Sequence, residues 1–187
     1  MTVPTLLTWL RVAAIPLMLG IYALPPAWMG VAERNALATL LFVLSALTDW
    51  FDGFLARRWN QTSAFGAFLD PVADKLMVSA ALLVLLELSR IGALVALIII
   101  GREIAITALR EWMARIGRAR AVAVNWLGKV KTATQMASIP LLLYDGRVGG
   151  LSTARWGGWL LDVAAALTLW SMLYYFKLAL RDTRGGE

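Results

Sequence analysis

The chain has 187 residues, of which 60% are apolar and only 16% charged, and it contains neither histidine nor cysteine. Soluble domains are about half apolar and about a quarter charged, so this composition indicates a membrane protein. The two missing residue types exclude disulfides, thiolate catalysis, haem ligation by histidine and the usual zinc sites, so a bound metal would need oxygen ligands. The net charge of +6 is better explained by basic cytoplasmic loops than by nucleic-acid binding.

The first predicted element is a short amphipathic helix at the N-terminus. Val3, Leu6, Leu7 and Leu10 recur at helical spacing, which favours a helix lying at the membrane interface before the first span. The apolar run after Arg11 is too long for the core of a signal peptide and lacks a small-residue cleavage site. We therefore interpret this run as a retained first span.

Six membrane spans are predicted, and four of the five junctions between them contain glycine, proline or polar residues, at 25–30, 60–63, 89–92 and 145–150. The predicted spans cover residues 11–24, 36–57, 64–87, 91–114, 127–144 and 156–177. No internal repeat is visible, so we expect residues 1–187 to form one domain. The predicted fold class is all-α integral membrane, with six transmembrane helices and the short N-terminal interfacial helix.

Lysine and arginine are concentrated in the loops on one side of the predicted spans, which sets the expected orientation. The positive-inside rule places both termini and these loops in the cytoplasm. The cytoplasmic set is Arg57, Arg58, Arg110, Arg115, Arg118, Arg120, Lys129, Lys131, Lys177, Arg181 and Arg184, against Arg34, Arg90, Arg147 and Arg155 on the other side.

Four aspartates lie near the end of the second span and the start of the third. Asp49 and Asp52 are three residues apart, and Asp70 and Asp74 are four apart, so each pair lines one helix face. The connecting loop is short, so we expect the two helices to be antiparallel neighbours whose carboxylates converge at the cytoplasmic end. Two ions such as magnesium could then clamp the attacking and leaving oxygens of a phosphoryl-type displacement.

The alternative is that these aspartates are ordinary interfacial charges paired with nearby basic residues. Aspartate is too short to reach water well from membrane depth, and like charges one helical turn apart repel. An ionisable group at membrane depth costs at least about 2.5–3.5 kcal/mol on insertion scales, so four together favour a function. The small residues Gly53, Ala56 and Gly66 beside them could allow close helix packing, make room for a nucleotide, or do both.

A cationic group is predicted at the cytoplasmic ends of the fourth and fifth spans, formed by Arg102, Arg110, Lys129 and Lys131. Arginine and lysine converging there suit an anionic substrate such as a phosphate. The alternative is contact with anionic lipid head groups. Arg102 lies inside an apolar run, which favours a pocket for that residue.

The spacing Asp49-x2-Asp52-Gly53-x2-Ala56-Arg57-x8-Gly66-x3-Asp70-x3-Asp74 resembles the full signature of the CDP-alcohol phosphatidyltransferases. Eight fixed positions within 26 residues make this a specific match. The segments 3–11, 48–60, 102–103, 108–114, 128–135 and 168–173 also resemble the bacterial branch of that family that uses glycerol 3-phosphate as acceptor.

The resemblance implies transfer of the phosphatidyl group from CDP-diacylglycerol to glycerol 3-phosphate, with release of CMP. It implies that Mg²⁺ or Mn²⁺, as two ions, is held by the four aspartates and that Asp74 is also the general base. The residues alone do not distinguish which aspartate is the base. The resemblance further implies a homodimer in the bacterial inner membrane, surrounded by membrane lipids, and a CDP site formed by Gly53, Ala56, Arg57 and Gly66.

Two other functions remain open at this point. The signature concerns the CDP half of the reaction, so the acceptor could instead be inositol phosphate, serine or another alcohol, although the cationic group favours a phosphorylated one. An ion transporter could also use intramembrane acids, but it would spread them across the membrane depth. In this sequence the aspartates gather near one interface.

Overall fold

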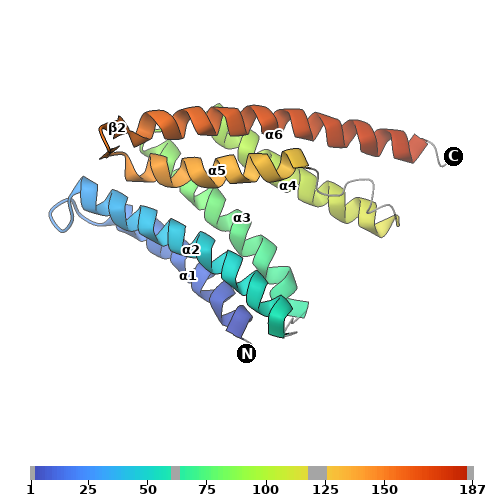
Figure 1. Ribbon diagram of the computed structural model, residues 1–187, viewed down its shortest axis with the longest axis horizontal. Helices are drawn as coiled ribbons and strands as arrows, with labels where there is room; N and C mark the ends of the chain where they lie inside the picture. The colour runs from blue at the N-terminus through green and yellow to red at the C-terminus, as the bar shows by residue number, and fades with distance from the viewer. Residues whose placement is uncertain (1–2, 60–63, 118–125, 185–187) are drawn as a thin grey trace.

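The computed structural model describes residues 3–59, 64–117 and 126–184. In these ranges the chain forms six helices and one two-stranded hairpin (Figure 1). The elements are α1 (Val3–Ala23), α2 (Val31–Trp59), α3 (Ala64–Glu87), α4 (Ala93–Arg115), α5 (Trp126–Tyr144), β1 (Arg147–Val148), β2 (Leu151–Ser152) and α6 (Thr153–Arg184). The predicted all-helical class is confirmed, with the small hairpin added.

The hairpin replaces a segment that the sequence analysis had treated only as a break between helices. β1 and β2 pair antiparallel, with Val148 opposite Leu151. Gly149 and Gly150 between them have φ angles of 58° and 83°. A two-residue turn with positive φ at both positions matches the twist of the two strands, and glycine adopts it without steric cost.

The predicted N-terminal interfacial helix does not exist as a separate element. α1 runs continuously from Val3 to Ala23. Pro4 stands in its first turn, where proline is tolerated, and no glycine or further proline interrupts the chain before Pro16. Thr8 and Arg11, which were expected near the interface, are buried inside the bundle. The prediction of a distinct interfacial helix was therefore wrong.

The distribution of polar and apolar side chains is that of a membrane protein. Large apolar side chains such as Leu83, Leu97 and Trp170 are more than half exposed, whereas Arg102 and Lys131 are buried. Three helices contain stretches long and apolar enough to cross a membrane, namely Leu6–Ala23, Val31–Asp49 and Thr153–Leu173. The helices α3, α4 and α5 have 24, 23 and 19 residues but contain the charged and polar groups discussed below.

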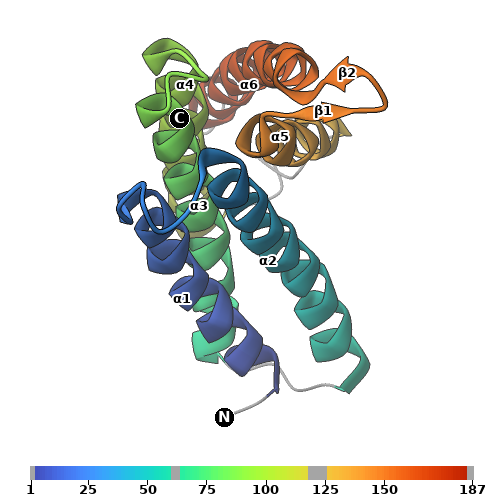
Figure 2. The same ribbon diagram turned by 90° about the vertical axis from the view of Figure 1, so that its left-hand side faces the viewer.

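The helices associate around a shared apolar core. α1 packs against both α2 and α3, more extensively than those two pack against each other, and α5 packs along α6 (Figure 2). The buried core includes Met18 of α1, Phe42 of α2, Leu82 and Leu85 of α3, and Leu142 of α5. Figure 1 shows the start of α1, the end of α2 and the start of α3 at the same end of the bundle, and the aspartates belong to the helices of that end.

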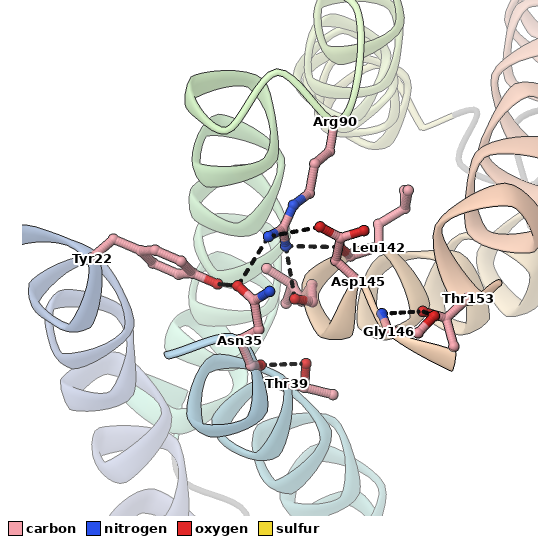
Figure 3. A network of polar contacts seen from close by, with 9 residues as sticks. Tyr22, Asn35, Thr39, Arg90, Leu142, Asp145, Gly146 and Thr153 are labelled. Carbon is pink, nitrogen blue, oxygen red and sulfur yellow. Dashed lines mark hydrogen bonds and ion pairs between the residues drawn. The ribbon is translucent and has the colours of Figure 1, made fainter. Parts of the chain in front are cut away.

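At the opposite end, Arg90 joins three parts of the chain (Figure 3). Its Nη1 donates to the carbonyl oxygens of Leu142 and Leu143, at 3.0 Å and 2.8 Å, in the last turn of α5. Its Nη2 lies 3.0 Å from Asn35 Oδ1 of α2 and 3.2 Å from Asp145 Oδ2. The guanidinium therefore satisfies helix-end carbonyls that would otherwise lack a donor, and it connects α2 to α5.

We expect Arg90→Met to lower the free energy of unfolding by about 1–3 kcal/mol, because partly buried acceptors lose their donor. Arg147→Met is the matched control, since Arg147 is exposed in the hairpin near the same end and surface changes usually stay within about 0.5 kcal/mol. The measurement is thermal or denaturant unfolding in detergent micelles, followed by circular dichroism. Equal destabilisation by both substitutions would contradict the bridging role of Arg90.

Candidate active site

Asp49 of α2 is held by an arginine from α1. Arg11 Nη1 lies 2.8 Å from Asp49 Oδ1. The Arg11 side chain is 1% exposed, whereas that of Asp49 is 43% exposed. A buried cation therefore balances one face of the Asp49 carboxylate, and the rest of that carboxylate remains accessible to a ligand.

Asp70 of α3 is also connected to α1, because the Thr8 hydroxyl donates a hydrogen bond to Asp70 Oδ1. Thr8 and Arg11 are three residues apart and so share one face of α1. This face of α1 contacts the aspartate-bearing parts of both α2 and α3. The sequence predicts that the aspartate faces of α2 and α3 meet directly. In the structure α1 also contributes a side chain to each of them, Arg11 to Asp49 and Thr8 to Asp70.

Asp74 is partly buried one helical turn after Asp70 and faces two hollows. The first is a small hollow that it shares with Arg11 and Ser45. The second is a cleft of about 90 Å³ whose polar lining also includes Glu103 and Gln135. Charge interactions couple Asp74 to both Asp49 and Glu103. Asp74 therefore lies between the other aspartates and the polar residues in the middle of α4 and α5.

The cleft ends at a buried charge cluster centred on Glu103 of α4. Lys131 of α5 forms an ion pair with Glu103 Oε1. Arg102 Nη1 lies 3.1 Å from the same oxygen, and its Nη2 lies 3.4 Å from Ser171 Oγ of α6. Two cations thus share one carboxylate, and the positive charge of Arg110 acts on Lys131 as well. This cluster keeps an excess of positive charge beside the cleft.

The predicted site residues therefore divide into three groups. Asp49, Asp70 and Asp74 line the α1–α3 end, and Arg102 and Lys131 meet at Glu103, with Arg110 within electrostatic range. Gly66 is buried near the start of α3. The remaining side chains lie outside the described part of the structure: Asp52, Gly53, Ala56, Arg57 and Lys129.

The donor chemistry fits a hard divalent cation. Asp49, Asp70 and Asp74 offer only carboxylate oxygens, the ligand type that magnesium and manganese prefer. Among the side chains that the structure describes, no three acidic groups are close enough to form a metal cluster by themselves. The fourth aspartate of the signature, Asp52, is not among them. Convergence of all four carboxylates consequently stays a prediction.

Three contributing residues were not among the predicted site residues: Thr8, Arg11 and Glu103. Thr8 falls in the segment that the sequence predicts as an interfacial helix, and Arg11 is the first residue of the first predicted span. The signal that could have identified Arg11 is its position directly before an apolar run, where a buried charge needs a partner. Glu103 directly follows Arg102 in the sequence, but its partner Lys131 is 28 residues away on another helix.

Comparisons with known proteins find relatives over nearly the whole chain. The family model for CDP-alcohol phosphatidyltransferase matches residues 1–170. The chain is 50% identical, over 184 residues and 96% of both sequences, to the CDP-diacylglycerol–glycerol-3-phosphate 3-phosphatidyltransferase of Pectobacterium atrosepticum. It is 48% identical, over 186 residues and 96% of both sequences, to the proteins of the same name from Salmonella choleraesuis and Escherichia coli.

Proposed function

This chain belongs to the CDP-alcohol phosphatidyltransferase family, and we propose that it transfers the phosphatidyl group of CDP-diacylglycerol to glycerol 3-phosphate, releasing CMP. The observation that carries the proposal is 48–50% identity, across 96% of both sequences, to relatives named for this reaction. The structure adds a physical basis, because carboxylates and cations border one cleft. This arrangement suits a reaction between two phosphate-containing substrates.

The CDP-lipid half of the site is assigned to the signature residues. Asp49, Asp52, Asp70 and Asp74 would hold divalent metal, as two ions of Mg²⁺ or Mn²⁺. Such ions, when bound, would stabilise the negative charge that develops on the phosphates during displacement. In this proposal the CDP moiety lies against the signature residues Gly53, Ala56, Arg57 and Gly66, where small side chains permit close approach and Arg57 offers a guanidinium to phosphate oxygens.

The acceptor half is assigned to the cationic group. Arg102, Arg110, Lys129 and Lys131 would bind the phosphate of glycerol 3-phosphate, and its terminal hydroxyl would extend along the cleft to Asp74. The Asp74 carboxylate takes the hydroxyl proton while the acceptor oxygen bonds to the phosphatidyl phosphorus. The bond from that phosphorus to the CMP oxygen breaks, and CMP leaves with the electron pair.

We further propose that all six helices span the bacterial inner membrane, with both termini and the site on the cytoplasmic side. The basic loops favour this orientation, and burial of Arg102 of α4 and Lys131 of α5 inside the bundle keeps these two charges away from lipid. The homodimer is a proposal that rests on the family resemblance alone.

The test of the proposed reaction is CMP release by the purified protein from CDP-diacylglycerol. We expect release with glycerol 3-phosphate and none with free glycerol, because buried cations select an anionic acceptor. The acceptor panel should also contain inositol phosphate, serine and choline. Faster CMP release with any of these than with glycerol 3-phosphate would refute the proposed acceptor.

A further inference from the structure

Gln135 of α5 is a buried polar group whose carbonyl oxygen has no partner. The residue is 4% exposed, and within the described ranges of the chain Oε1 has no hydrogen-bond donor. Buried side-chain oxygens in folded proteins are nearly always paired, so an unpaired one next to a cavity needs an explanation. Gln135 lines the same cleft as Asp74 and Glu103.

The position of Gln135 on α5 relates it to the acceptor. Gln135 follows Lys131 by four residues, so both side chains lie on one face of α5 at a separation of about 6 Å along the helix axis. This length is comparable to the distance from the phosphate to the terminal hydroxyl of a three-carbon phosphate ester. A ligand with its phosphate near Lys131 and its terminal hydroxyl near Asp74 would therefore extend along the cleft that Gln135 also lines, so that the Gln135 side chain can reach the hydroxyl on the middle carbon.

The cleft has room for such a group. Its volume of about 90 Å³ is several times the roughly 10–15 Å³ that one buried water requires. Its lining includes the apolar Val78 and Met136 in addition to Asp74, Glu103 and Gln135. The remaining lining residues are Lys75 and Thr132, so a small acceptor molecule enclosed there would meet Gln135 Oε1 as the single side-chain amide oxygen of the described lining.

We propose that Gln135 Oε1 accepts a hydrogen bond from the secondary hydroxyl of the acceptor, and that Gln135 thereby selects a glycerol phosphate over a phosphorylated alcohol lacking that hydroxyl. This inference rests on the proposed transfer to glycerol 3-phosphate and goes beyond it, because it assigns recognition of the second hydroxyl to one side chain. A site built to pair with a substrate hydroxyl discriminates strongly against the analogue without it, since its own polar group is then left unpaired.

The test uses two acceptors, glycerol 3-phosphate and propane-1,3-diol monophosphate, which differ only in the secondary hydroxyl. Wild-type kcat/KM for CMP release should favour glycerol 3-phosphate by about tenfold to a hundredfold. Gln135→Met keeps the side-chain length but cannot accept this hydrogen bond well. It should lower kcat/KM for glycerol 3-phosphate by that factor and leave the value for the analogue nearly unchanged. Gln135→Glu retains side-chain oxygens that can accept a hydrogen bond, so it should retain the preference for glycerol 3-phosphate over the analogue.

Thr168→Val is the matched control, because Thr168 Oγ1 is also buried and without a partner among the described residues, yet it lies outside the cleft lining. Thr168→Val should leave the ratio of the kcat/KM values for the two acceptors as in the wild type. Equal use of both acceptors by the wild type, or an equal loss with both in Gln135→Met, would overturn the assignment of Gln135. Absence of CMP release with glycerol 3-phosphate would instead overturn the proposed function, and this assignment with it.

Discussion

Replacement of Asp74 by asparagine is expected to reduce kcat for CMP release by about two to four orders of magnitude while leaving the helices folded. The amide has nearly the same shape as the carboxylate but cannot take the proton of the acceptor hydroxyl, and a positioned general base contributes about 10²–10⁴ in rate. Asp74 is the aspartate that borders the cleft with Glu103 and Gln135. The measurement is kcat at saturating concentrations of both substrates, with circular dichroism as the check on folding.

Two further variants distinguish Asp74, proposed as both base and metal ligand, from Asp49, proposed as a metal ligand alone. Asp49→Asn removes a carboxylate that would bind metal, so it should raise the metal concentration needed for half-maximal activity and be partly rescued by added Mg²⁺ or Mn²⁺. Added metal should not rescue Asp74→Asn. Glu87→Gln changes an exposed residue at the end of α3, the helix that carries Asp74. It should leave both kcat and the metal requirement unchanged. A near-normal rate for Asp74→Asn would exclude Asp74 as the base.

The second large effect is expected at Lys131. Its side chain is 1% exposed and paired with Glu103, so Lys131→Gln removes a cation from the acceptor site and leaves Glu103 with Arg102. Loss of a charge-assisted hydrogen bond costs about 1.5–3 kcal/mol, which corresponds to roughly tenfold to over a hundredfold in kcat/KM. We expect this loss mainly as a higher KM for glycerol 3-phosphate, with the KM for CDP-diacylglycerol little changed.

Arg110→Gln should raise the KM for glycerol 3-phosphate by less than Lys131→Gln does, because Arg110 is more exposed than Lys131. Arg115→Gln is the control for a change of net charge, since Arg115 is 76% exposed and paired only with its helical neighbour Glu111 among the ion pairs described. It should leave both KM values as in the wild type. Equal effects of Lys131→Gln on the two KM values would mean that Lys131 does not belong to the acceptor site.

Sequence patterns located the helices best where an apolar run ended at clear breakers. α3 was predicted at 64–87 and occupies Ala64–Glu87. The start of α2 was placed at 36, five residues late, because Arg34 and Asn35 looked like loop residues. Within α2 the Arg34 side chain donates to the carbonyl oxygens of Leu24 and Met29, and Asn35 is bonded by Arg90. A hydropathy pattern does not include the hydrogen-bond partners that other segments of the chain provide to polar residues such as Arg34 and Asn35.

The chemistry of the site was decided largely by the sequence itself. The absence of histidine and cysteine leaves oxygen as the only plausible metal donor. The helix period predicts that Asp49 and Asp52 share one helix face and that Asp70 and Asp74 share another. These conclusions needed no fold, because residue type and position along one helix are enough to derive them.

Only the tertiary structure shows which groups pair with the carboxylates of Asp49, Asp70 and Glu103. Thr8 reaches Asp70 across 62 residues of sequence, Arg11 pairs with Asp49, and Glu103 is shared by Arg102 and Lys131. A buried charge requires a partner, but that requirement does not specify which helix supplies it. The partner depends on how the helices pack together, and this packing places α1 beside Asp49 of α2 and Asp70 of α3.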